Sequence, residues 1–162
     1  MTIKMRNIYI KNNVLILLGL LLLGLLCSPT LLAKTDIKYF SSQQNIDNNY
    51  PFSDAVQVGD LLFLSGQIGF DSAKGKLVEG GIQAETKQTM NNIRTSLSSY
   101  GYTMNDVVKC TVMLADIADW PAFNNEYKAY FPLHFPARSA FATNGLALSA
   151  KVEVECIAAK SE

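Results

Sequence analysis

Residues 1–33 differ in composition from a globular core, so the folded domain is expected to form from the residues that follow them. They contain basic side chains but no acidic one, and from Val14 to Leu26 no side chain is charged or forms hydrogen bonds. A basic start followed by an apolar run of this length is typical of a secretory signal, whereas a membrane span usually needs about 20 apolar residues. The sequence therefore predicts a signal peptide or an N-terminal membrane anchor over residues 1–33, and an exported protein, periplasmic or secreted.

The end of this leader leaves two alternatives for its processing. Leu31, Leu32 and Ala33 place a small residue last, which suits cleavage near Ala33. Cys27 offers lipidation instead, but Leu26 stands where lipoprotein signals have a small residue. We therefore expect cleavage near Ala33, and contact with a membrane only if the leader is retained.

The rest of the chain is long enough for one ordinary domain and is acidic, which limits its partners. Without residues 1–33, Lys and Arg fall from 14 to 11 against 14 Asp and Glu, so the net charge is near −3. No basic run remains, and we expect no nucleic-acid partner bound through its phosphates. His134 is the only histidine, which excludes a multi-histidine metal site, and we expect it in a loop or an interface.

Two cysteines follow the leader, Cys110 and Cys156, both in apparent strands with apolar neighbours. The sequence favours two buried thiols that pack as small hydrophobic side chains. A disulfide between them requires adjacent and suitably oriented strands, which sequence alone does not establish.

Composition and periodicity predict the elements of the domain. Residues 34–49 are polar and predict a tether, and the domain itself is expected over residues 50–162. Gly59 and Asp60 predict a hairpin turn, and Gly101 sits where a helix C-cap belongs. We expect strands over 55–59, 61–64, 107–115, 137–143 and 151–159, a loop over 71–81, and helices over 82–100 and 120–131, the second with Asp119 as N-cap.

The resulting order is β-β-α-β-α-β-β, an α+β domain with both helices on one face of a mixed sheet. In the last strand Val152, Val154 and Cys156 alternate with Glu153 and Glu155, which gives it one apolar and one polar face. These carboxylates indicate that the second face of the sheet is not simply core.

Several strings, taken together, resemble the RidA/YjgF/UK114 family. The resemblance covers about residues 50–160, in the family's order and spacing. It implies a chorismate-mutase-like fold and a homotrimer in which three sheets enclose a central β-barrel, with clefts between subunits. A small domain buries a limited fraction of its surface alone and gains from such an assembly. The matching strings are Phe52–Val56, Leu62–Gln67, Asn92–Ile93, Val107–Met113, Asn124–Tyr127, Phe135–Ser139 and Val152–Ala158.

The resemblance also implies an activity, the hydrolysis of 2-imino acids or their enamine tautomers to 2-oxo acids and ammonia. Arg138 is the matched arginine, and its planar fork suits a bidentate grip on the substrate carboxylate. Glu155 is the matched carboxylate, expected to orient the attacking water and shuttle a proton, whereas Glu153 is interpreted as structural. Positioning and electrostatics suffice for so reactive a substrate, and we expect neither a cofactor nor a metal.

Five further residues complete the predicted substrate site. Ser65 and Gly66 would line the cleft through their backbones, since Gly allows close approach. Asn124 would reach the cleft from the second helix, or else satisfy a buried polar contact. Phe52 stands where the family commonly has Tyr, and Ala140 where its best-known members have Cys. These two departures leave open a trimer that binds a small carboxylate without turnover. An endoribonuclease or translation inhibitor is a third hypothesis, disfavoured by the acidic balance and the lack of a histidine pair.

Overall fold

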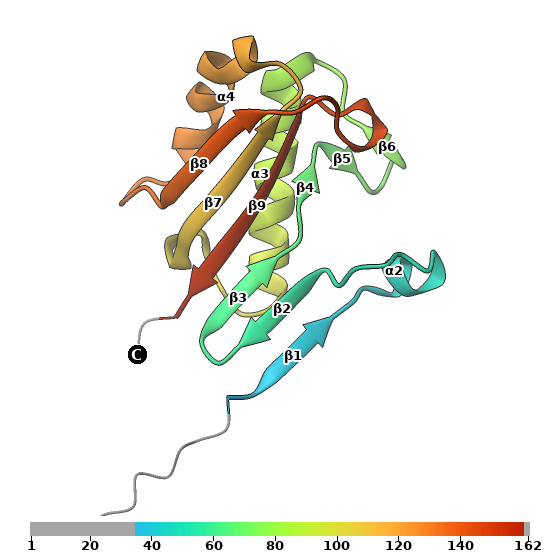
Figure 1. The fold of residues 1–162 in the computed structure, drawn as a ribbon, viewed down its shortest axis with the longest axis vertical. Helices are drawn as coiled ribbons and strands as arrows, with labels where there is room; N and C mark the ends of the chain where they lie inside the picture. Colours follow the sequence, from blue (N-terminus) through green and yellow to red (C-terminus); the bar gives the residue numbers. More distant parts are fainter. Residues whose placement is uncertain (1–34, 161–162) are drawn as a thin grey trace, which may run out of the picture. The chain divides into compact units, whose positions relative to one another are not determined.

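Backbone pairing joins most of the strands into one seven-stranded sheet, in the order β1-β2-β3-β9-β7-β8, with β4 also paired to β9 (Figure 1). The computed structural model describes residues 35–160, so the predicted leader over residues 1–33 lies outside the described residues. Every pairing is antiparallel except that of β7 with β8, which is parallel. The strands of this sheet are β1 (Ile37–Phe40), β2 (Ala55–Val58), β3 (Leu61–Leu64), β4 (Gln67–Ile68), β7 (Val107–Leu114), β8 (Ala137–Ala142) and β9 (Val152–Ala159).

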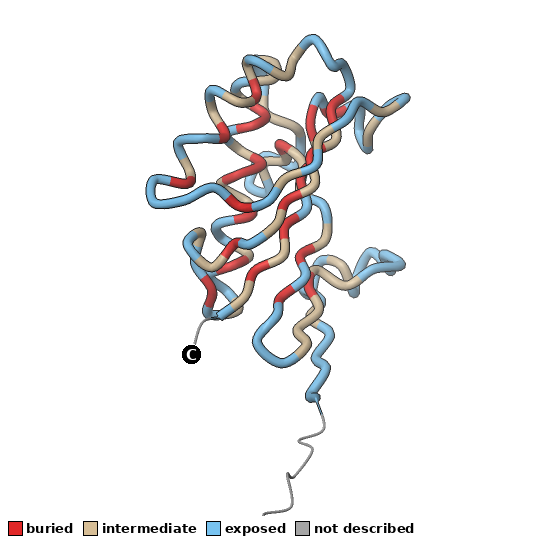
Figure 2. The backbone as a smooth tube through the Cα atoms, turned by 60° about the vertical axis from the view of Figure 1, so that its left-hand side comes forward, coloured by how far each residue is buried: buried red, intermediate tan, exposed pale blue. Residues whose placement is uncertain are grey.

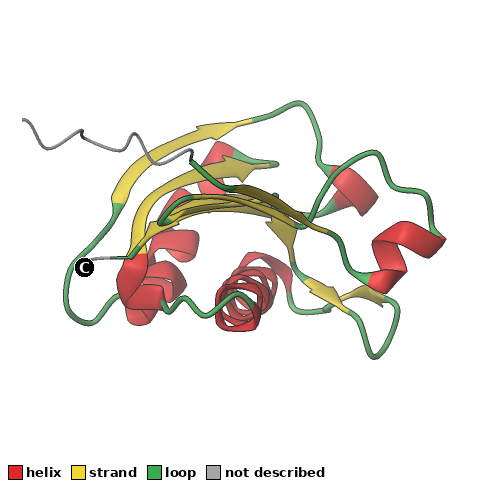
Figure 3. Ribbon diagram, turned by 90° about the horizontal axis from the view of Figure 1, so that it is seen from below, coloured by secondary structure: helices red, strands yellow, loops and turns green. Residues whose placement is uncertain are grey.

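The two main helices, α3 (Gly81–Ser99) and α4 (Trp120–Tyr127), lie on the same face of this sheet (Figure 3). Buried residues alternate with less buried ones along the long strands and recur along the helices (Figure 2). The predicted α+β class, its mixed sheet and the placement of both helices are therefore confirmed. In residues 35–160 no helix combines the length and the apolar composition that crossing a membrane requires.

Helix α3 ends at Ser99, and the predicted glycine, Gly101, follows its C-cap residue Tyr100. Gly101 has φ +77°, a conformation that costs other residues steric strain. The Gly101 N–H donates to Ser98 O at 3.1 Å and the Tyr102 N–H donates to Leu97 O at 2.9 Å, which is the Schellman pattern. Tyr102 is then buried in the core.

The second helix begins at Trp120 with Asp119 in the N-cap position, as predicted, but a different side chain makes the capping hydrogen bond. Asp116, not Asp119, caps the turn that leads into α4, because its Oδ1 accepts from the Ala118 N–H at 2.9 Å. Asp119 makes no side-chain cap hydrogen bond. The helical path continues as a short 3₁₀ turn, η3 (Lys128–Tyr130), and stops before Pro132 as expected.

The predicted polar tether over residues 34–49 is wrong for most of its length. Residues 37–40 form β1, which pairs with β2, and a short helix, α2 (Gln43–Asp47), follows with Ser42 as its N-cap. Three of the four β1 side chains are exposed, so the segment shows no core-facing pattern from which a strand could be predicted. Backbone hydrogen bonds hold it at the sheet edge instead.

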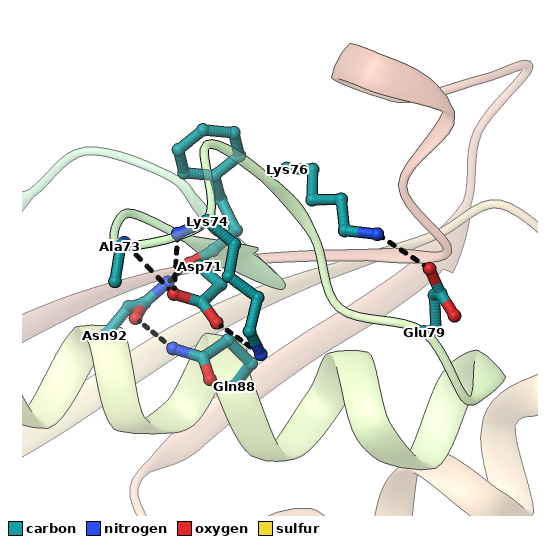
Figure 4. A network of polar contacts seen from close by, with 8 residues as sticks. Asp71, Ala73, Lys74, Lys76, Glu79, Gln88 and Asn92 are labelled. Carbon is teal, nitrogen blue, oxygen red and sulfur yellow. Dashed lines mark hydrogen bonds and ion pairs between the residues drawn. The ribbon is translucent and has the colours of Figure 1, made fainter.

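The predicted loop over residues 71–81 contains a small hairpin, β5 (Phe70–Asp71) paired with β6 (Lys76–Leu77). The Asp71 carboxylate closes the turn by accepting backbone N–H groups, as Figure 4 shows. On α3, Asn92 Nδ2 donates to the carbonyls of Ile68 and Phe70, both at 3.0 Å. Asn92, one of the residues that carry the resemblance, thus fixes the chain between β4 and β5.

The prediction of two free thiols is also wrong. Cys110 and Cys156 are directly opposite each other on β7 and β9, and their sulfurs form a disulfide of 2.03 Å. Both residues are buried on the helix-covered face. The bond forms because the topology makes the last strand a neighbour of β7, which sequence alone does not reveal.

The face of the sheet opposite the helices carries both apolar and charged groups. Leu61 and Phe63 are each 39% exposed there, and Phe141 is 47% exposed. The apolar run in β3 predicts a strand covered on both sides, yet within one chain only its helix-facing half is buried. This face, which we call the open face, therefore leaves apolar surface without a covering element in the described residues.

Candidate active site

Arg138 lies on β8, the edge strand of the sheet, and its side chain points to the helix-covered side. Three aromatic rings of the α4 region surround its guanidinium. Cζ lies 4.9 Å from the ring centroid of Tyr127, 5.7 Å from that of Phe123 and 5.8 Å from that of Trp120. These distances are within the range of cation–π attraction. Aromatic residues recur every three or four positions from Trp120 to Phe131, an aromatic stripe whose spacing predicts core packing. Three of these rings also form a cage around the arginine.

The guanidinium of Arg138 has no acidic partner in residues 35–160, where the ion pairs are Lys38–Asp36, Lys74–Asp71 and Lys76–Glu79. No hydrogen bond from Arg138 occurs within the same part of the chain. Since an arginine fork presents five N–H donors, the donors of Arg138 remain available to an anion.

A cavity of about 340 Å³ adjoins Arg138. Asn124 and Tyr127 reach it from α4, while Phe135 and Pro136 come from the segment that leads into β8. The structure thus brings Asn124 and Arg138 to the same cavity. Lys128 completes a lining that contains no acidic residue.

Glu153 occupies the open face on β9, beside Gly66. A β-carbon built on Gly66 would collide with the Glu153 carboxylate, whose Cδ would lie 2.9 Å away. The absence of a side chain at residue 66 therefore makes room for this carboxylate. Burial raises the pKa of Glu153 above its ordinary value, and the negative charge of Glu155 raises it further.

The two carboxylates of β9 have different surroundings. Glu155 is exposed and lines a small cavity of about 120 Å³ with Phe63, Lys109 and Thr111. Glu153 is half-buried, packs on Gly66 and has a pKa that burial raises, features that favour it over Glu155 as an acid/base group. The strand alternation places both on one face but carries no signal for which of them is enclosed.

The other predicted residues have distinct surroundings. Ser65 Oγ donates to Ser53 O at 2.6 Å, so its hydroxyl holds the segment before β2. Phe52 is 52% exposed and stacks on Tyr50 with ring centroids 5.6 Å apart. Ala140 packs against the core on the helix-covered side.

One chain does not bring Arg138 and Glu153 to a common ligand. Arg138 is in register with Cys110 and Glu153 with Met113, so two strand spacings and three residues of strand length separate them, on the order of 10 Å or more. The side chains also lie on opposite faces of the sheet. Residues 35–160 contain no group of three or more His, Cys, Asp or Glu residues that is arranged to hold a metal ion.

The model of the endoribonuclease L-PSP family matches residues 42–160. The chain belongs to this family. Its L-PSP relatives include a goat (Capra hircus) 2-iminobutanoate/2-iminopropanoate deaminase, 46% identical over 67% of this chain and 79% of the relative.

Solved structures give the same assignment of fold. RidA from an Antarctic Psychrobacter bacterium is 35% identical, with a TM-score of 0.65 over 68% of this chain and 89% of that one. Escherichia coli TdcF with bound serine is 28% identical, with a TM-score of 0.66 over 68% and 89% of the two chains. The L-PSP match begins at residue 42 and so includes half of the segment predicted as a tether.

Proposed function

We propose that this protein hydrolyses small 2-imino acids, of the 2-iminobutanoate and 2-iminopropanoate type, to 2-oxo acids and ammonia. The observation that carries the proposal is Arg138, a guanidinium held in an aromatic cage beside a cavity, with no acidic partner in residues 35–160. A substrate with a carboxylate next to a C=N carbon matches such a site. The deaminase names of the relatives support the same chemistry.

In the proposed reaction Arg138 binds the carboxylate and fixes the position of the neighbouring C=N carbon. Water adds to that carbon, its oxygen forms the new C–O bond, and the nitrogen takes up a proton. The C–N bond of this intermediate then breaks, the oxygen loses its proton, and a 2-oxo acid and ammonia leave. Glu153 is proposed to accept the proton of the attacking water and to return one to the leaving nitrogen, in place of Glu155.

A homotrimer with clefts between subunits is part of the proposal. The open face exposes Leu61, Phe63 and Phe141 without a covering element in the described residues, which favours contact with further copies of the chain. The separation of Arg138 and Glu153 within one chain favours a cleft to which two copies contribute.

The test couples an amino-acid oxidase, which forms 2-imino acids in situ, to semicarbazide trapping. Wild type should lower the trapped product, and Arg138→Ala should not. Arg94→Ala is the matched control, because the Arg94 guanidinium stacks on the Tyr130 ring, with Cζ 5.8 Å from the ring centroid, and does not line the cavity. Its loss should leave imine decay at the wild-type rate. Glu153→Gln should lose most of the activity and Glu155→Gln little of it.

Other outcomes of this assay identify the alternatives. If neither wild type nor any variant changes imine decay, but small carboxylates still bind, the protein is a binding trimer without turnover. If purified protein cleaves RNA in an Arg138-dependent and salt-independent way, the endoribonuclease hypothesis replaces ours. We expect no such cleavage, because the chain without its leader is acidic.

We also propose that the protein works outside the cytoplasm, with residues 1–33 removed near Ala33. The Cys110–Cys156 disulfide supports this location, because such bonds persist in oxidising compartments and are rare in reducing ones. Cell fractionation with intact-mass analysis tests it. Recovery of the complete chain in the membrane fraction would refute the cleavage, and recovery in the cytoplasm would refute the export.

A further inference from the structure

The hydroxyl of Tyr127 is buried without a hydrogen-bond partner. Tyr127 is only 4% exposed, and within residues 35–160 no donor or acceptor contacts its Oη. Leaving a buried polar group unsatisfied destabilises the folded state, whereas a phenylalanine would fill the same space without that cost. The hydroxyl therefore calls for a partner that the folded chain alone does not supply.

The position of Tyr127 indicates where that partner binds. The residue lines the cavity beside Arg138, and its ring centroid is the nearest of the three caging rings to Cζ. Burial raises the pKa of Tyr127 to about 12, with the Arg138 charge acting in the opposite direction, so the hydroxyl stays a donor at neutral pH. A donor next to a cation suits an anionic acceptor.

The cage also accounts for how Arg138 is held. A carboxylate beside the guanidinium would fix its orientation but would occupy the N–H donors and offset the charge. A carboxylate would accept two strong hydrogen bonds from the guanidinium. Aromatic ring faces attract the same cation but leave its N–H donors unoccupied. Arg138 is thereby oriented while its charge and donors remain available to a ligand.

We propose that Tyr127 is a positioning and ligand-binding residue: its ring orients Arg138, and its hydroxyl donates a hydrogen bond to the carboxylate that Arg138 binds. This inference rests on the carboxylate-binding part of the proposed function and is independent of turnover. It assigns the site a third donor group beside the two arms of the arginine fork.

The experiment compares Tyr127→Phe with wild type, using protein purified from cells that express the full chain. Titration calorimetry with 2-oxobutanoate, the proposed product, measures binding of a carboxylate without imine chemistry. Thermal unfolding without ligand measures the structural effect of the same change. Tyr130→Phe is the matched control, because the Tyr130 hydroxyl contacts Lys87 O and Asn91 Oδ1, both at 3.0 Å, and lies outside the cavity.

The two variants should behave in opposite ways. Tyr127→Phe should weaken 2-oxobutanoate binding by about tenfold, the effect of losing one hydrogen bond to a charged group, with an unchanged or higher melting temperature of the free protein. Tyr130→Phe should lower the melting temperature and leave affinity unchanged. Tyr127→Leu, which removes the ring as well, should weaken binding more than Tyr127→Phe.

Each contrary result has one meaning. Unchanged affinity in Tyr127→Phe, with or without a lower melting temperature, overturns the role of the hydroxyl. Equal affinity of Tyr127→Leu and Tyr127→Phe overturns the role of the ring. If wild type binds 2-oxobutanoate and Tyr127→Phe binds it tenfold more weakly, but no imine is hydrolysed, the inference stands and the deaminase proposal fails. If wild type binds no 2-oxobutanoate, both fail.

Discussion

The disulfide between β7 and β9 gives the prediction with the best-defined magnitude. Cys110 and Cys156 are 46 residues apart in sequence, so the bond closes a loop of that length in the unfolded chain. In the chain-entropy model a loop of this size lowers the entropy of the unfolded state enough to stabilise the fold by about 4 kcal/mol. Reduction should remove this contribution while leaving the same side chains in place.

The assay is urea unfolding of oxidised and reduced wild type at one protomer concentration, because any association also contributes to apparent stability. With a dependence of about 2 kcal/mol per molar urea, the midpoint should fall by roughly 2 M on reduction. Peptide mapping should find Cys110 and Cys156 in one cross-linked pair before reduction. The double variant Cys110→Ala, Cys156→Ala is the control and should not respond to the reductant.

Two results would refute this reasoning. Equal midpoints for oxidised and reduced protein would mean that the cross-link does not restrict the unfolded chain. Free thiols at both positions in protein recovered from the oxidising compartment would mean that the bond does not form, which would also remove its support for export.

Three further predictions concern Glu153, Gly66 and Gly101. Because folding raises the pKa of Glu153, this carboxyl favours the folded state at pH values below its ordinary pKa of 4.5 and loses that contribution as pH rises. The melting temperature of wild type relative to Glu153→Gln should therefore decline from pH 4 upward, and a constant difference would contradict the assignment. Gly66→Ala should displace the Glu153 carboxylate and lower imine hydrolysis by about 100-fold, the loss also expected for Glu153→Gln, while a wild-type rate would show that Glu153 need not sit there. Gly101→Ala forces φ +77° on a residue with a β-carbon and should cost about 1 kcal/mol in denaturant unfolding, and a neutral result would mean that the helix end relaxes.

Local patterns in the sequence predict the two main helices and the strands β2, β3, β7, β8 and β9, because those patterns act within one or two turns or strand repeats. The stretch without Gly or Pro that ends at Gly101 determines α3, and alternation determines the two faces of β9. The strand β1 escapes prediction since its stability comes from backbone pairing with β2. A segment with exposed side chains leaves no hydrophobic pattern to detect.

Some features of the candidate site can be predicted from sequence, and others are seen only in the tertiary structure. The sequence by itself predicts that Arg138 lies at the start of a strand, that an aromatic stripe precedes it, and that Glu153 and Glu155 share a face. Only the tertiary structure decides that the stripe encloses Arg138 and that Gly66 packs on Glu153. It also decides that Cys110 meets Cys156. These outcomes depend on which strands become neighbours across long stretches of chain, and periodicity within a strand or helix carries no information about that choice.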